Sequence, residues 1–312
     1  MGISAYLTED LHSLPETGTM SFLDEFGGHT MVGRLRLVMM CRPGVAGWSS
    51  GNGSWHKMGY HHHPDFETAQ RQHEVLVRCL QAAGIQTTFL TPAEGLSMDA
   101  VYTHDASFMT DFGAIIMRMT KPCRQTEPQY HRRFYERHQI PVIGEIQPPG
   151  TAEAGDLVWL GQKTLLVGRG YRTNTEGIHQ LRDLLSPKGI EIIVAPLSHG
   201  AGPDFCLHLM SLISLLDEHT ALVDSPLLAV QTLELLKKRA MNLIEMDEAE
   251  RNTLGCNVLA LDERHLVAME ENHCTNRRLR EAGFELHTFP ASEIGINGGG
   301  GPTCLTRPLL RS

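Results

Sequence analysis

Residues 156–168 read DLVWLGQKTLLVG, in which two short apolar runs flank a Gly-Gln-Lys turn. Runs of this length, rich in aromatic and β-branched residues and separated by a glycine-containing turn, are typical of a β-hairpin. Downstream, Thr173 and Glu176 form a capping-box pattern, which marks the start of a helix. The apolar residues of that helix recur at helical spacing, and the strand-like run IEIIVAPL follows from residue 190. The sequence therefore predicts a unit of hairpin, helix and strand.

The same elements recur from residues 107, 207 and 257, and a strand, a helix and a strand are expected at 35–40, 65–83 and 86–90. A polar residue opens each hairpin at intervals of about 50 residues, the signature of an internal repeat. These residues are Asp105, Asp156, His208, Asn257 and Cys304. If the strand after Cys304 pairs with the first strand, the ring closes and exposed sheet edges disappear. We therefore expect an α/β fold, a five-bladed α/β propeller with pseudo-fivefold repeats, and an α/β fold without closure is the alternative.

The composition is that of a globular protein, with 41% apolar and 20% charged residues. We expect one domain over residues 1–312, with residues 1–32 as an N-terminal extension. No run approaches the roughly 20 apolar residues of a membrane span, and the pattern of a signal peptide is missing, so a cytoplasmic protein without a membrane partner is expected. The net charge of -9 disfavours nucleic acid and favours a small cationic ligand. A monomer and a homodimer both stay open.

The seven cysteines are odd in number, scattered and never paired as C-x-x-C, which argues against a disulfide framework and a thiolate metal site. Cys206 is expected to be a small buried hydrophobic residue. Cys304 differs because it follows a glycine run, in the stretch INGGGGPTCL at residues 296–305. Consecutive glycines are useful where the backbone adopts positive φ or comes close to another group. Either this segment approaches a ligand, or it is a flexible tail.

Closure of the ring would bring Cys304, His208, Asp105, Asp156 and the adjacent Glu153 to one central cavity. A thiol becomes a good nucleophile only as a thiolate, which needs nearby positive charge or a base. Because most of the other candidate groups are carboxylates, the missing positive charge is most simply that of the substrate. A guanidinium fits, since its forked N–H donors match carboxylates in pairs. Asp156 is as well suited to capping backbone N–H groups as to contacting substrate.

The loop at residues 44–63 carries four histidines between positions 56 and 63. Consecutive side chains in a loop do not converge readily on one ion, so a solvated loop or lid is favoured over a metal site. Three aromatic residues of the loop are expected to cover the cavity rather than to join the core: Trp48, Trp55 and Tyr60.

Four motifs in matching order now point to a family: PGTAEAGD at 149–156, YRTNTEG at 171–177, LHLMS at 207–211 and GGGGPTCLT at 298–306. Together they resemble the dimethylarginine dimethylaminohydrolases of the pentein, or guanidine-modifying, superfamily, which includes arginine deiminases and amidinotransferases. The resemblance implies a five-bladed α/β propeller (pentein fold) without a metal or another cofactor.

The resemblance also implies residue roles. Cys304 is the expected nucleophile and His208 the general acid and base, while Asp105 and Glu153 hold the guanidinium. Asp99 matches a position near the substrate, and Arg172 matches an arginine that grips the amino-acid carboxylate. A second carboxylate-gripping arginine falls on either Arg124 or the neighbouring glutamine.

The expected activity is therefore cysteine-dependent hydrolysis at the guanidinium carbon of arginine or N-methylated arginine. It would give citrulline and an amine through a covalent thiouronium intermediate, in arginine metabolism. The enzyme class is a hydrolase of C–N bonds other than peptide bonds in linear amidines. The alternatives are an amidinotransferase, a deiminase or dihydrolase of another guanidino compound, and a guanidine-binding protein without activity.

Overall fold

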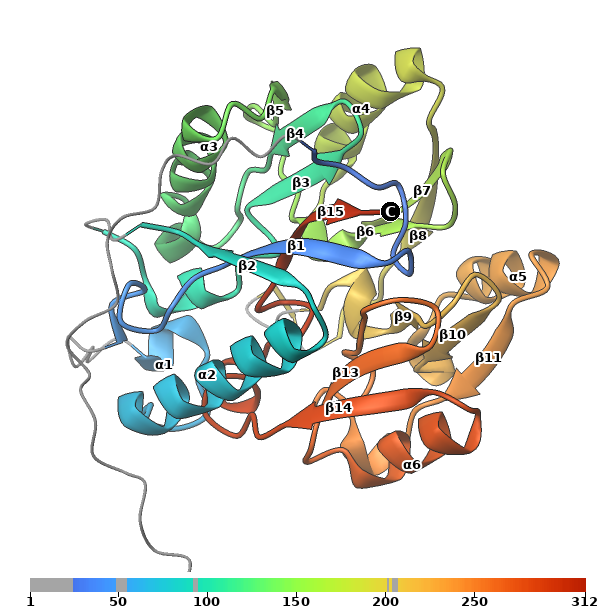
Figure 1. Cartoon of the computed structure of the whole chain (residues 1–312). Helices are drawn as coiled ribbons and strands as arrows, with labels where there is room; N and C mark the ends of the chain where they lie inside the picture. The colour runs from blue at the N-terminus through green and yellow to red at the C-terminus, as the bar shows by residue number, and fades with distance from the viewer. Residues whose placement is uncertain (1–24, 49–54, 92–94, 201, 204–206) are drawn as a thin grey trace, which may run out of the picture.

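The computed structural model describes residues 25–48, 55–91, 95–200, 202–203 and 207–312, and the expectation for Cys206 lies outside these residues. Their strands form five three-stranded sheets (Figure 1). The sheets comprise β1 Leu35–Met40, β2 Gln86–Phe89 and β15 Arg307–Arg311; β3 Ser107–Thr110, β4 Gly113–Ile116 and β5 Val142–Glu145; β6 Leu157–Trp159, β7 Thr164–Arg169 and β8 Glu191–Pro196; β9 Ile213–Leu215, β10 Thr220–Val223 and β11 Asn242–Glu245; and β12 Leu259–Ala260, β13 His265–Met269 and β14 Glu285–Phe289.

All five sheets share one topology. In the third, β6 pairs antiparallel with β7, and β7 pairs parallel with β8. A parallel pair needs a crossover connection, and a helix supplies it in each sheet. The helices are α1 Trp55–Met58, α2 Phe66–Ala82, α3 Glu127–Arg137, α4 Thr175–Leu185, α5 Val230–Lys238 and α6 His273–Glu281. The predicted unit of hairpin, helix and strand is confirmed.

The ring closes through the two ends of the described chain. The last strand, β15, pairs antiparallel with β1, with Leu35 opposite Arg311. Figure 1 shows the dark red β15 beside the blue β1. Residues before β1 add to this closure, because Gly27 donates its N–H to the carbonyl of Leu309 and accepts one from Arg311. The expected α/β propeller with five repeats is confirmed.

The start of α4 differs from the prediction by one residue. The N-cap is Asn174, whose side chain accepts the N–H of Gly177. The predicted cap, Thr173, instead accepts the backbone N–H of Glu153 with its hydroxyl. A long-range contact to the neighbouring loop therefore takes the hydroxyl that the local pattern assigned to the helix.

Two of the three aromatic residues expected in a lid lie in the core. Trp48 and Tyr60 are 4% and 5% exposed, and their rings meet edge to face. The indole N–H of Trp48 donates to the carbonyl of Met98. The lid interpretation was wrong for these two residues because both rings pack in the core cluster that also contains residues of β1, whereas Trp55 is only partly buried. Among the described residues, no helix has the length and apolar character needed to cross a membrane.

Candidate active site

The polar residues that open the five hairpins lie just before the first strand of each sheet, so the fold gathers them at one end of the ring. Asp105 precedes β3, Asp156 precedes β6 and Cys304 precedes β15. Hydrogen bonds link these segments directly, since His104 donates its backbone N–H to the carbonyl of Cys304 at 3.1 Å. The nucleophile candidate and the carboxylate candidate next to His104 are therefore held together.

His208 lies between two carboxylates. Its Nε2 is 2.9 Å from Oε2 of Glu153, and its Nδ1 is 3.8 Å from Oδ1 of Asp105. The imidazole is buried, with 4% exposure. The close approach depends on Gly155, where an added Cβ would lie 2.5 Å from Nδ1 of His208. The three side chains predicted to act on a guanidinium are thus in mutual contact.

Asp105 is buried, and both of its carboxylate oxygens accept hydrogen bonds. Its Oδ2 accepts a hydrogen bond from Nη1 of Arg124 at 2.7 Å, and its Oδ1 accepts the N–H of Gly155 at 3.2 Å. Burial alone would raise the pKa of Asp105, but the charges of His208 and Arg124 bring that pKa below its ordinary value.

Arg124 is fully occupied by protein groups. Besides Asp105, it binds Glu127 through Nε at 2.9 Å and through Nη2 at 2.8 Å. Burial raises the pKa of Glu127 to about 7, although the Arg124 guanidinium acts in the opposite direction. Gln125, the other position considered for a second carboxylate-gripping residue, lines a different cavity. Arg124 therefore holds Asp105 in place rather than a ligand.

Glu153 is held on several sides. Its Oε1 accepts the backbone N–H of Thr120 at 2.8 Å and lies 4.0 Å from Nη1 of Arg172, while its Oε2 faces His208. Burial opposes ionisation, but the hydrogen bond from His208 brings the pKa of Glu153 below its ordinary value. The carboxylate is fixed before any ligand arrives.

Asp156 supports the histidine segment. Its Oδ1 accepts the backbone N–H of Leu209, the residue after His208, at 2.9 Å. Its side chain is fully buried, and burial raises its pKa to about 6. Of the two interpretations from sequence, capping of a backbone N–H is the one that these contacts match.

Cys304 is half-buried at the end of the glycine run. Its Sγ accepts a hydrogen bond from Nδ2 of Asn257 at 3.1 Å. Side chains at Gly298 and Gly300 would collide with the ring of Tyr102, and Gly299 has a φ of 80°. The glycine run therefore serves both purposes considered above, since it allows a positive φ and a close approach of the backbone to another group. The groups approached, as far as the structure describes them, are protein side chains. Approach of this segment to a ligand stays a prediction.

A cavity of about 1080 Å³ carries Arg172 in its wall. Arg172 is 2% exposed, and its Nε and Nη2 have no hydrogen-bond partner among the described residues. Lys121, also in the wall, donates to Oδ2 of the buried Asp99 at 3.0 Å. The other described lining residues are His56, Lys57, Met58, Gly59, Gly95, Leu96, Ser97, Thr120, Pro122, Cys123 and Pro203. Arg172 thus lies in the cavity wall next to Glu153, and two of its guanidinium nitrogens are buried without a hydrogen-bond partner among the described residues.

The charge balance of the site differs from the one expected. The sequence argument counted carboxylates and assigned the compensating charge to the substrate. In the structure Asp105 is paired with Arg124 and Asp99 with Lys121. Both cations come from the loop after β4 and its 3-10 turn, where the sequence suggested Arg124 only as a residue that grips the substrate carboxylate.

Oxygen and nitrogen atoms of Asp105, Glu153 and His208 lie within 4.8 Å of one another, a donor set that suits a divalent metal. These donors are already engaged with each other and with Arg124, so a metal would have to displace those contacts. In the histidine-rich loop, Nε2 of His62 is 3.4 Å from Oε1 of Glu293. The expectation of a metal-free protein stays a prediction.

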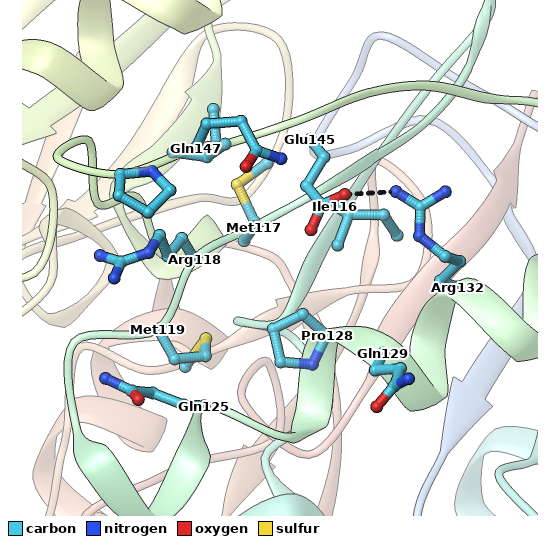
Figure 2. Close-up of a pocket in the computed structure, with 12 residues that line it drawn as sticks. Ile116, Met117, Arg118, Met119, Gln125, Pro128, Gln129, Arg132, Glu145 and Gln147 are labelled. Atoms are coloured by element: carbon cyan, nitrogen blue, oxygen red, sulfur yellow. Dashed lines mark hydrogen bonds and ion pairs between the residues drawn. The ribbon is translucent and has the colours of Figure 1, made fainter.

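Figure 2 shows a second cavity, of about 400 Å³, between α3 and the sheet of β4 and β5. Arg132 on α3 reaches Glu145 at the end of β5, with Nη2 2.6 Å from Oε2. The lining of this second cavity includes Met117, Met119 and Gln125 but none of the described residues that surround His208. We assign the chemistry to the first site.

A sequence profile of the family described as "Arginine deiminase" matches residues 97–235 and 228–311, which include every candidate site residue. The chain belongs to this family. The uncharacterized protein YkgA of Bacillus subtilis is 28% identical over 282 residues, which cover 90% of this chain and 94% of YkgA. The N(G),N(G)-dimethylarginine dimethylaminohydrolase of Pseudomonas aeruginosa is 27% identical over 237 residues, covering 76% of this chain and 87% of that enzyme.

The fold is shared with solved structures of the same group. The P. aeruginosa dimethylarginine dimethylaminohydrolase complexed with citrulline superimposes with a TM-score of 0.72 at 23% identity, over 89% of this chain and all of that one. Together with the family profile and the P. aeruginosa sequence relative, this confirms the resemblance to dimethylarginine dimethylaminohydrolases within the pentein superfamily. This arginine deiminase family member shares an enzyme class, hydrolysis of C–N bonds in linear amidines, with its named relatives.

Proposed function

We propose that this member of the arginine deiminase family is a cysteine-dependent hydrolase of arginine or N-methylated arginine, giving citrulline and an amine. The single observation that carries the proposal is the buried imidazole of His208 between Asp105 and Glu153, on a ring whose last turn presents Cys304. Two ionised carboxylates beside an imidazole favour a planar cation that donates several N–H groups.

In the first half-reaction the thiolate of Cys304 attacks the central guanidinium carbon. A C–S bond forms, and the C–N bond to the departing amine breaks as His208 transfers a proton to its nitrogen. Asp105 and Glu153 bind the remaining guanidinium N–H groups. The product of this step is an S-alkyl thiouronium on Cys304 together with a free amine.

In the second half-reaction water replaces the amine. His208, now neutral, takes a proton from water, and the oxygen attacks the thiouronium carbon. The C–S bond breaks and the thiolate of Cys304 is regenerated. The carbon keeps the oxygen, whose remaining proton passes to solvent, and a ureido group results. Arginine would release ammonia and dimethylarginine would release dimethylamine, with citrulline as the common product.

The tail of the substrate is assigned to the cavity beside Arg172. A guanidinium has the fork geometry that binds a carboxylate through two hydrogen bonds. Nε and Nη2 of Arg172 are buried and have no partner among the described residues, so a small turn of the side chain towards the cavity would let them bind the carboxylate of the substrate. The dimethylarginine dimethylaminohydrolase relative from P. aeruginosa supports an amino-acid substrate.

The test is a panel of arginine, methylated arginines, agmatine and guanidino acids, with citrulline, ammonia, methylamine and dimethylamine measured as products. We expect citrulline from at least one arginine derivative, no turnover by Cys304→Ser, and a covalent adduct in the intact mass of His208→Ala. Amidino transfer to an added amine without hydrolysis would support the amidinotransferase alternative. Residual turnover by Cys304→Ser above a few per cent would overturn the mechanism.

A further inference from the structure

The side chain of Asn257 lies against the sulfur of Cys304. Asn257 opens the hairpin of β12 and β13 and is 6% exposed. Its Nδ2 is 3.1 Å from Sγ of Cys304, and its Oδ1 is 3.1 Å from the backbone nitrogen of Thr303. One amide therefore contacts both the candidate nucleophile and the residue before it.

The orientation of this amide follows from its partners. The backbone N–H of Thr303 can only donate, so the oxygen of the Asn257 side chain must face it. The NH2 group is then turned towards Cys304, and the sulfur is the acceptor. A thiolate accepts an N–H hydrogen bond much better than a neutral thiol does, because charged acceptors strengthen such bonds.

The glycine run makes the contact possible. A Cβ at Gly301 would lie 2.5 Å from Oδ1 of Asn257. Any side chain at that position would push the amide away from the turn that carries Cys304. The repeat pattern of the sequence marked Asn257 as equivalent to Asp105 and His208, but it gave this residue no chemical role.

We propose that Asn257 is a catalytic residue that donates a hydrogen bond to the sulfur of Cys304, stabilising the thiolate and aiming it at the substrate. The inference rests on the proposed nucleophilic role of Cys304. It supplies stabilisation from the protein itself, in addition to that from the bound cation.

The variant Asn257→Asp keeps an oxygen for the N–H of Thr303 but removes the N–H group that faces the sulfur. Asn257→Leu removes the donor without adding charge. Asn276→Asp is the matched control. Asn276 is a buried asparagine on α6, the helix that connects β13 and β14 of the same repeat, and its Nδ2 donates to the carbonyl of Met269.

The readout is the rate of alkylation of Cys304 by iodoacetamide between pH 5 and 9, with substrate absent. Tryptic cleavage after Arg280 and Arg311 gives a peptide of residues 281–311 whose only cysteine is Cys304, so mass spectrometry follows this thiol alone. We expect both Asn257 variants to be alkylated roughly tenfold to a hundredfold more slowly at pH 7. A hydrogen bond to a charged group stabilises it enough to change its ionisation equilibrium by such a factor. The Asn276→Asp control should change the alkylation rate by no more than about twofold, because the side-chain amide of Asn276 bonds the carbonyl of Met269 and effects of separate sites are independent.

Profiles of folded Asn257→Asp and Asn257→Leu that overlay the wild type would overturn the proposal, and the Asn257→Leu profile is the decisive one because this variant adds no charge beside the sulfur. If both variants fail to fold, the side-chain NH2 signal of Asn257 in the NMR spectrum of the wild type is the test. That signal should shift as Cys304 ionises and stay fixed in Cys304→Ala, and a signal that does not move would refute the donor role.

Failure of the proposed function would look different. If no guanidino compound is turned over while the alkylation profiles still depend on Asn257, the substrate assignment fails and the donor role stands. With an active substrate, the Asn257 variants should lower kcat with little change in KM.

Discussion

Arg124 offers the sharpest test of how the site is held, because it joins Asp105 to Glu127 and all three residues are buried. Arg124→Met removes a 2.7 Å bond to Asp105 and a two-pronged contact to Glu127. Removing one partner of a buried ion pair costs about 3–5 kcal/mol, because the carboxylates stay buried without compensation. For a chain of this size the loss corresponds to a fall in Tm of roughly 10 °C.

The loss should depend on pH. Asp105 has a pKa below its ordinary value in the folded protein, so the stability it contributes is present above that ordinary value and is lost as the pH falls. Without Arg124 the carboxylate gains by becoming protonated. The difference in unfolding free energy between Arg124→Met and the wild type should therefore be larger at pH 8 than at pH 5, measured by urea unfolding.

A second substitution separates stability from activity. Adding Glu127→Leu removes one of the two carboxylates that Arg124→Met leaves without a partner. The double variant should recover about half of the lost unfolding free energy, because buried ion pairs are often replaced by apolar groups at little cost. Its kcat/KM should stay about a hundredfold below the wild type, because Asp105 has lost its anchor. Recovery of activity in the double variant, or a loss below about 1 kcal/mol in the single one, would refute the reasoning.

The matched control is Arg251→Met in the fourth repeat. Arg251 binds the buried Asp224 through Nε at 2.6 Å and Nη2 at 2.9 Å, so the variant also leaves a buried carboxylate without its partner, although the Arg251 side chain is more exposed than that of Arg124. Its stability should fall while kcat/KM stays close to that of the wild type. A similar loss of activity in this control would mean that destabilisation alone explains the Arg124 result.

Three further predictions concern close packing, the substrate tail and acid stability. Gly155→Ala should lower kcat/KM about a hundredfold, because the methyl group displaces His208, whereas Gly44→Ala, whose nearest neighbour would be 3.8 Å away, should not. Arg172→Met should raise KM for arginine roughly tenfold to a hundredfold and leave agmatine unchanged, which steady-state kinetics would contradict if both shifted alike. Burial lowers the pKa of His73 to about 3, so below about pH 6.5 the unfolded state binds a proton that the folded state does not. The unfolding free energy should therefore drop by about 1.4 kcal/mol per pH unit. His73→Leu should lessen this dependence, measured by urea unfolding at pH 7 and pH 5.

The repeat was readable from sequence because each unit is local. Hairpins, helices and strands are specified by the spacing of apolar residues and by turns, and the polar residue before each hairpin marks its register. Helix starts were less secure, as Asn174 and not Thr173 caps α4. The hydroxyl of Thr173 is used by a loop from another part of the sheet, a contact that no local pattern contains.

Some residues of the candidate site could be predicted from the sequence, and others could not. Cys304, His208 and Asp105 were found because they share one repeat position, and Glu153 because it lies within a motif. The cations Arg124 and Lys121 were missed as partners of these carboxylates, since the loop that carries them has no repeat position to mark it. Trp48 was misjudged because a glycine-rich loop gives no sign of which face of the sheet it will cover.

The sequence by itself determined the five repeated units and the chemical types that open them, because both depend on neighbours within a few tens of residues. Only the tertiary structure decided which groups touch: that His208 lies between two carboxylates, that Arg124 anchors one of them, and that Asn257 points its amide at a sulfur 47 residues away. The physical reason is ring closure, which brings the starts of separate sheets together at distances that no spacing along the chain encodes.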